Sequence, residues 1–107
     1  MSADAIRELN DRFRTTMTGG QVLMTAGVNA LPSDVKAMVI RRVATFTDFN
    51  ADNDPHGEHD FGSFTIAGRK FFWKIDAYDV EMRFGSPDPA DPAKTTRVLT
   101  IMLAEEY

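Results

Sequence analysis

Two alternating stretches joined by Ala67-Gly68 constrain the fold of this chain more than any other feature. Residues 61–67 and 70–78 each alternate between two sets of side chains, with the period of two that is typical of a β-strand. The dipeptide between them suits a tight turn. One face of the second stretch is apolar and comprises Phe71, Trp73 and Ile75. The pattern predicts a β-hairpin with an apolar face that a second layer must cover.

Two helices are expected to supply that layer. An apolar stripe at steps of three and four predicts the first helix, and Gly19-Gly20 is expected to end it. The stripe comprises Ile6, Leu9, Phe13 and Met17. A second helix is expected to open at Pro32 or Ser33. Its apolar face comprises Val35, Met38, Val39, Val43 and Phe46.

Two further strands are expected, at residues 21–27 and 95–104. In residues 21–27 both alternating sets of side chains are apolar enough for burial on both faces. Residues 95–104 are ambiguous, since Asp91-Pro92 could cap a helix while the β-branched side chains of the segment favour a strand. The strand is the favoured interpretation.

These elements predict a single α+β domain over residues 1–107, in the order α-β-α-β-β-β. Two helices are expected to pack on one face of a mainly antiparallel four-stranded sheet. The longest apolar stretch, residues 98–104, is far shorter than the roughly 20 residues that cross a bilayer. The first residues lack the pattern of a signal peptide. The chain is therefore expected in the cytoplasm and away from membranes.

Composition excludes several classes of function. The chain has no cysteine, which excludes disulfides, zinc–thiolate sites, iron–sulfur clusters and a cysteine nucleophile. The net charge is −4, which argues against direct nucleic-acid binding and against a toxin-like ribonuclease. Residues 48–107 hold twelve acidic and six basic side chains, whereas residues 1–47 hold four acidic and six basic ones. An acidic second half favours attraction of a cation or of a basic partner surface.

The polar loop at residues 48–60 holds two histidines three positions apart among carboxylates. Imidazole with carboxylate suits zinc, manganese, iron or nickel, and His56, Glu58 and His59 would be the ligands. The spacing matches neither a calcium-binding loop nor the helical His-Glu-x-x-His motif. The alternative is a loop whose Asp and Asn side chains bond nearby backbone N–H groups.

A second polar cluster lies at the end of the predicted hairpin. Lys74, Asp76 and Tyr78 share a strand face, and Asp79 follows them. If this strand ends near the acidic loop, Asp76 could meet His59 and orient the imidazole as a general base. No nucleophile completes such a site, because neither serine of the second half lies in a Gly-x-Ser-x-Gly context. Ion pairing is the alternative role of these side chains.

Three stretches of the chain resemble a known family. They are residues 25–28 with Leu31-Pro32, residues 53–62, and residues 88–104. The sequence is similar over residues 6–107 to short alphaproteobacterial proteins of a family of unknown function, often plasmid-borne. The resemblance implies a bacterial cytoplasmic protein. The plasmid association implies a role in mobile-element maintenance or in evasion of defence, but no activity, cofactor or catalytic residue.

The favoured hypothesis is a non-enzymatic protein-interaction module, such as a small acidic inhibitor or adaptor acting on a basic or nucleic-acid-binding protein. Residues 48–60 and 76–91 would form the contact region, because an acidic field steers a basic partner. The expected partner-binding residues are Asp52, Asp54, His56, Glu58, His59, Asp60, Asp76, Tyr78 and Asp79. The partner is an unidentified protein, the number of copies in the assembly is left open, and no cofactor is expected. The alternative is a metal-binding domain or small metal-dependent hydrolase that uses the His56-Gly57-Glu58-His59-Asp60 loop.

Overall fold

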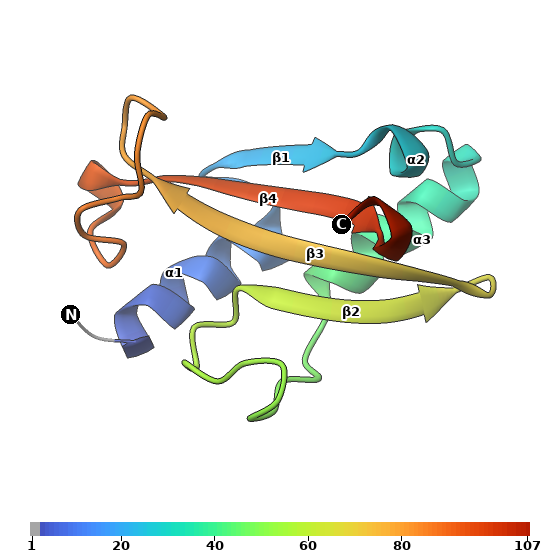
Figure 1. Cartoon of the computed structure of the whole chain (residues 1–107), viewed down its shortest axis with the longest axis horizontal. Helices are drawn as coiled ribbons and strands as arrows, with labels where there is room; N and C mark the ends of the chain where they lie inside the picture. Colours follow the sequence, from blue (N-terminus) through green and yellow to red (C-terminus); the bar gives the residue numbers. More distant parts are fainter. Residues whose placement is uncertain (1–2) are drawn as a thin grey trace.

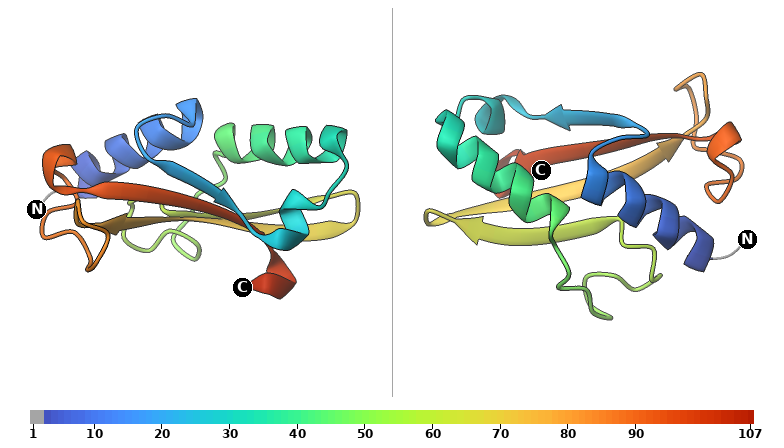
Figure 2. Two further views of the ribbon diagram at one scale, coloured as in Figure 1. Left: turned by 90° about the horizontal axis from the view of Figure 1, so that it is seen from above. Right: turned by 180° about the vertical axis from the view of Figure 1, so that it is seen from behind.

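A four-stranded sheet carries two helices on one face in the computed structural model, which describes residues 3–107 (Figure 1). The elements are α1 (Ala3–Thr16), β1 (Gln21–Met24), α2 (Ala26–Asn29), α3 (Ser33–Ala44), β2 (Phe61–Ile66), β3 (Arg69–Tyr78), η1 (Pro92–Lys94), β4 (Thr96–Leu103) and η2 (Ala104–Glu106). The helices α1 and α3 cover the same face of the sheet, and η2 lies toward the other face (Figure 2). The predicted α+β class is confirmed.

The sheet has the strand order β1-β4-β3-β2 and is mostly antiparallel. The central strand β3 runs antiparallel to both β2 and β4, whereas β1 runs parallel to β4. The expected hairpin is confirmed, since Ala67 and Gly68 have φ of 52° and 78°, as a two-residue turn between twisted strands requires. The strands β1 and β2 therefore form the two edges.

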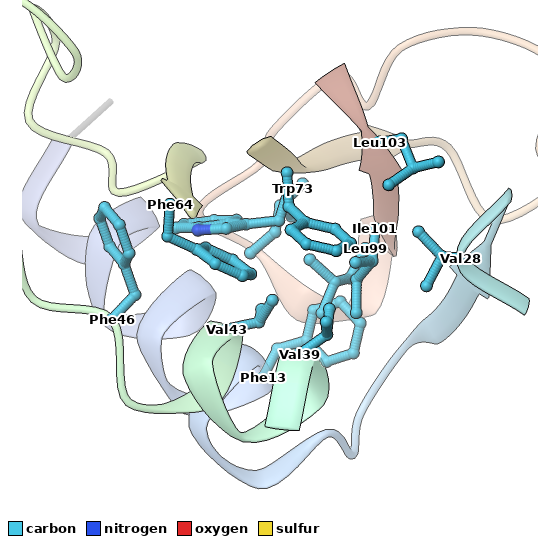
Figure 3. Close-up of a cluster of buried hydrophobic side chains, with 12 residues drawn as sticks. Phe13, Val28, Val39, Val43, Phe46, Phe64, Trp73, Leu99, Ile101 and Leu103 are labelled. Carbon is cyan, nitrogen blue, oxygen red and sulfur yellow. The ribbon is translucent and has the colours of Figure 1, made fainter. Parts of the chain in front are cut away.

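One hydrophobic core fills the space between the sheet and the helices (Figure 3). The predicted apolar face of β3 is confirmed, and Trp73 and Phe71 are fully buried at its centre. Gly62 on β2 lies directly over the indole, because a Cβ atom at Gly62 would stand 2.4 Å from Nε1 of Trp73. The glycine is thus required by the close approach of strand and ring.

The strand expected at residues 21–27 is shorter than predicted, and a short helix takes its last part. β1 ends at Met24, and α2 follows. The carboxylate of Glu106 accepts hydrogen bonds from the Thr25 hydroxyl (2.6 Å) and from the Gly27 N–H (2.9 Å). These bonds hold the backbone in a turn where the alternation alone predicts a continuing strand. The observed order is therefore α-β-α-α-β-β-β.

Two other boundaries depend on local backbone conformation and capping. The first helix ends at Thr16 rather than at the glycine pair, and Met17 adopts the left-handed conformation with φ of 57°. Residues 96–103 form the strand β4, as favoured. Asp91 caps the short helix η1 before it, accepting from the Ala93 N–H at 2.9 Å.

None of the helices in residues 3–107 is long and apolar enough to cross a membrane.

Candidate functional site

The fold brings the two acidic segments of the sequence to one end of the β2–β3 hairpin. Asp60 precedes β2 and Asp76 lies near the end of β3, and the two carboxylates repel one another. Burial raises the pKa of Asp60, and the negative charges of Asp54 and Asp76 act in the same direction. The expectation that residues 48–60 and the end of β3 share one surface therefore agrees with the topology.

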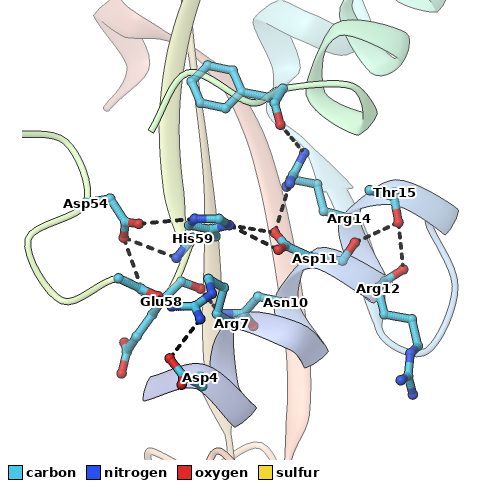
Figure 4. A network of polar contacts seen from close by, with 12 residues as sticks. Asp4, Arg7, Asn10, Asp11, Arg12, Arg14, Thr15, Asp54, Glu58 and His59 are labelled. Carbon is cyan, nitrogen blue, oxygen red and sulfur yellow. Dashed lines mark hydrogen bonds and ion pairs between the residues drawn. The ribbon is translucent and has the colours of Figure 1, made fainter. Parts of the chain in front are cut away.

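The imidazole of His59 is held between two carboxylates (Figure 4). Its Nδ1 lies 2.9 Å and 3.0 Å from the two oxygens of Asp11, and its Nε2 lies 3.5 Å from Oδ2 of Asp54. The ring stacks on Phe49 with a centroid distance of 3.7 Å. We call Asp11, Phe49, Asp54 and His59 the histidine clamp. It fastens the 48–60 loop to α1.

Asp54 shapes the backbone of the loop as well as holding the ring. Its Oδ1 accepts hydrogen bonds from the N–H groups of Glu58 and His59, each at 3.1 Å. His59 is in the left-handed region, with φ of 52°. A non-glycine residue tolerates that conformation when its surroundings fix it. The two N–H bonds and the clamp provide this support.

Arg14 lies behind the clamp and connects α1 to the end of α3. Its Nη2 donates to Asp11 at 3.0 Å, and its Nη1 donates to the carbonyl oxygens of Val43 (2.8 Å) and Phe46 (3.0 Å). The guanidinium lies 5.1 Å from the centre of the Trp73 ring, within cation–π range. The residue is 3% exposed. Arg14 thus adds a second donor to the Val43 carbonyl, which also accepts from the Phe46 N–H, and it pairs with the Phe46 carbonyl just after α3.

A groove of about 410 Å³ opens beside the clamp. Its lining comprises Asp11, Arg14, Thr15, Ala44, Thr45, Phe46, Thr47, Phe49 and His59. Both ring nitrogens of His59 face carboxylates, and both oxygens of Asp11 face the imidazole. This arrangement therefore fastens the 48–60 loop to α1 at the edge of the groove.

The other predicted ligands of the histidine loop do not converge on His59. His56 is exposed, and Glu58 uses its backbone carbonyl to accept from Asn10 at 2.9 Å. Within residues 3–107 no three histidine, aspartate or glutamate side chains are placed to hold a metal ion. The geometry of these donors gives the metal-dependent alternative no support.

The contact expected between Asp76 and His59 is not the one that forms. Asp76 pairs with Lys74 on its own strand at 3.0 Å, while Asp11 takes the position beside the imidazole. Side chains two apart on a strand lie on the same face, so this pair needs no movement of the backbone. Of the other residues expected to bind a partner, Asp52 is exposed, and Tyr78 forms a backbone bridge with Gly85.

The helix α1 also contributes polar side chains to this region, which the sequence pattern did not predict. Asn10 and Arg14 are each 3% exposed and lie on the buried side of α1, beside Phe13. The Asn10 side chain donates to the loop and accepts from Arg97 at 2.7 Å. The signal was available, since Asn10 and Arg14 follow Ile6 at steps of four along the helix.

The connection after β3 presents the most exposed apolar side chains of the acidic end. We call residues 79–85 the β3–β4 tip. Val80, Met82 and Phe84 are 60%, 40% and 74% exposed. Sequence reasoning missed them, although apolar and charged residues alternate through residues 80–84 directly after the strand. Exposed apolar side chains grouped in this way mark interaction sites.

Hydrogen bonds hold the β3–β4 tip in one conformation. The carboxylate of Asp79 accepts from the N–H groups of Glu81 (3.1 Å) and Arg83 (3.0 Å). The Asp79 N–H donates to the Phe84 carbonyl at 2.8 Å, which closes the loop. Asp79, expected to touch a partner, therefore has its carboxylate directed into the loop. Its role in this geometry is to present the apolar side chains.

We expect Asp60→Asn to raise the melting temperature at neutral pH. Burial lifts the pKa of Asp60 above its ordinary 3.8, so the folded chain binds this proton more tightly than the unfolded chain. The resulting stability is complete below pH 3.8 and is lost as the pH rises through the folded pKa. Asparagine cannot ionise, so the gain should vanish below pH 3.8.

Thermal unfolding between pH 3 and pH 7 checks this expectation. Glu8→Gln, which changes an exposed carboxylate on α1, is the control. A melting temperature of Asp60→Asn that equals the wild-type value at pH 7, or falls below it, would contradict the assignment.

Comparison with known proteins identifies a family. A family model described as "Protein of unknown function (DUF3768)" matches residues 24–106. The match includes the 48–60 loop and the β3–β4 tip, and it lies outside α1. No curated protein and no solved structure matches the chain.

Proposed function

The chain belongs to the DUF3768 family of proteins of unknown function, and on that premise we propose that it is a non-enzymatic protein-interaction module. The proposed contact surface is the β3–β4 tip with the acidic residues around it. The observation that carries the proposal is the exposure of Val80, Met82 and Phe84 on a hydrogen-bonded loop.

The chemistry of the tip supports a protein partner. Leaving three apolar side chains in water forgoes the free energy of their burial, roughly 25 cal/mol per Å² of apolar surface. A partner pocket that takes the Phe84 ring would recover part of that free energy. Since the loop is already fixed by Asp79, little conformational entropy is lost on binding. Aromatic side chains in such positions are frequent centres of binding energy.

Charge around the tip supports a partner with a basic rim. Glu81 forms an ion pair with Arg83 at 3.8 Å, and Asp88 and Asp91 follow in the same connection. The matching surface has an apolar pocket bordered by lysine and arginine side chains. Surfaces of that composition are common on proteins that bind nucleic acids. An inhibitor or adaptor acting on such a protein fits this arrangement, without direct contact of the chain with nucleic acid.

The proposed setting follows from the resemblance noted in the sequence. It is the cytoplasm of alphaproteobacteria, where the gene would often be carried on a plasmid. The target in that setting would be a nucleic-acid-binding protein of a mobile element or of a defence system. The acidic second half of the chain supports a basic target of this kind.

We expect Phe84→Ala to weaken partner binding at least about tenfold, because truncating a central aromatic anchor costs roughly 2 kcal/mol or more. The test uses the purified chain to capture proteins from a lysate of its source bacterium at low salt, with quantification by mass spectrometry. The dissociation constant of the captured protein is then measured directly. Binding should also weaken as salt is raised, since the rim is charged.

Leu23→Ala is the matched control, because Leu23 is 50% exposed and lies on β1, away from the tip. The control should bind as the wild type does. Equal recovery of the same partner by wild type and Phe84→Ala would overturn the proposed surface. Capture of proteins that are neither basic nor nucleic-acid-binding would overturn the proposed partner class.

A further inference from the structure

The strand β2 forms an outer edge of the sheet, with no strand beyond it (Figure 1). The Ile75 N–H donates to the Asp60 carbonyl at 2.8 Å, just before β2 begins. In an antiparallel pair the bonded positions alternate, so Gly62 and Phe64 bond to β3. The N–H and C=O groups of Ser63 and Thr65 consequently point away from the sheet.

The strand itself contains none of the residues by which proteins protect a free edge, and the 48–60 loop runs beside its N-terminal part only (Figure 1). Its sequence, Phe-Gly-Ser-Phe-Thr-Ile, contains no lysine, no proline and no charged residue. Its pairing with β3 runs from Phe61 to Ile66 without a bulge. An edge strand of this composition is a template for another strand. The other edge, β1, is only four residues long.

Basic side chains lie beside the second half of β2, and acidic ones lie on the loop before it. A groove of about 260 Å³ is lined by Ile66 and Met38, and the Arg42 guanidinium lies 5.4 Å from the centre of the Phe64 ring. Arg41 and Arg42 line this groove and have no carboxylate partner within residues 3–107. The acidic 48–60 loop lies at the N-terminal end (Figure 1).

Two carboxylates of that loop are available for pairing. Asp48 and Asp52 are exposed. In the part of the chain that the structure describes, neither side chain has a cationic partner. The loop that carries them is fixed by the histidine clamp. The two carboxylates therefore lie on a loop whose position is fixed.

We propose that β2 pairs antiparallel with β2 of a second copy of this chain. Antiparallel pairing of a strand with itself brings each acidic end against the basic end of the other copy. Ser63 of one copy would lie opposite Thr65 of the other, and their outward N–H and C=O groups would exchange hydrogen bonds. A two-fold axis relates the two copies, and two-fold symmetry is the commonest symmetry of soluble oligomers. A second copy fits better than another protein because one strand carries both complementary charges.

Thr65→Pro tests the backbone pairing. Proline removes the outward N–H of Thr65, and edge strands tolerate proline at such positions, so the monomer should still fold. Sedimentation equilibrium over a range of concentrations is expected to give the wild type twice the chain mass of 12.0 kDa and the variant the single mass. Circular dichroism and thermal unfolding check that the variant is folded. A wild type that stays at 12.0 kDa, or a folded variant that still dimerises, would overturn the proposal.

Charge reversal tests the antiparallel arrangement without altering the backbone. One variant carries Arg41→Glu with Arg42→Glu, and the other carries Asp48→Lys with Asp52→Lys. Each variant alone should be monomeric, because both of its ends then carry the same sign. An equimolar mixture should restore the dimer. Dimers of either variant alone, or a mixture that stays monomeric, would count against antiparallel pairing of β2.

The dimer and the proposed tip surface can be distinguished. Phe84→Ala is expected to leave the sedimentation result unchanged, since the tip lies on the connection between β3 and β4. Hydrogen exchange supplies a second readout. The amides of Ser63 and Thr65 should gain protection as protein concentration rises in the wild type but not in the charge-reversed variants. Concentration-independent exchange at both amides would overturn the pairing.

Discussion

Replacing Arg14 with alanine is expected to lower the free energy of unfolding by about 1–3 kcal/mol, the usual cost of leaving a buried hydrogen-bonding group without its partner. The guanidinium donates to Asp11 and to the carbonyl oxygens at the end of α3. Alanine would leave the Phe46 carbonyl without this donor, whereas the Val43 carbonyl would keep its bond from the Phe46 N–H. The substitution would also remove the cation from the Trp73 ring. Urea unfolding measures the change.

Two further variants separate the geometry of Arg14 from its charge. Arg14→Lys keeps the charge but loses the planar fork that reaches Asp11 and α3 together, so we expect only partial recovery of stability. Arg12→Ala, an exposed change on the same helix, should alter stability by at most about 0.5 kcal/mol. If Arg14→Ala proves as mild as Arg12→Ala, the bonds to α3 contribute far less than their burial implies.

Gly62→Ala is expected to destabilise the fold by about 1–3 kcal/mol, the usual cost of inserting an atom into a packed core. The new methyl group would stand 2.4 Å from Nε1 of Trp73 and 2.9 Å from a ring carbon of Phe46. Both rings are buried, so neither can move without disturbing the core around it. Strand or indole must shift to admit the methyl group.

A double-mutant cycle with Trp73→Phe checks that the indole is the cause. Phenylalanine lacks the atoms nearest to Gly62, and it also removes a buried indole N–H that has no hydrogen-bond partner in the structure. Gly62→Ala should therefore cost less in the Trp73→Phe background than in the wild type. Thermal unfolding of the four proteins gives the coupling energy. Strictly additive effects would show that the methyl group is accommodated elsewhere.

Local patterns were enough to predict most of the fold. The alternation of side chains predicted the β2–β3 hairpin, and the spacing of Val39 and Val43 predicted the buried face of α3. In both cases the period of the sequence follows from burial of one face of the element. The end of β1 could not be read in this way. It depends on Glu106, which is distant in sequence and reaches back to Thr25. A contact between residues so far apart in the sequence produces no periodic pattern in the residues around β1.

The candidate site was predicted less completely, for a related reason. Residue types identified His59 and Asp54 as polar residues of one loop, and the structure brings them together. The partner on the other side of the imidazole, Asp11, comes from α1, and no spacing rule connects the two segments. The exposure of Phe84 likewise follows from how Asp79 closes the loop. Sequence pattern alone does not specify that geometry.

The parallel pairing of β1 with β4 determines when the sheet can be completed during folding. Thr25 donates to Ile101, 76 positions further along the chain. The β2–β3 hairpin, by contrast, closes over only two residues. Since distant pairings carry the larger entropic penalty of loop closure, the hairpin and β4 should assemble first and β1 should join last. Until then, the exposed side of β4 is a transient second edge, open to incorrect association in a crowded cell.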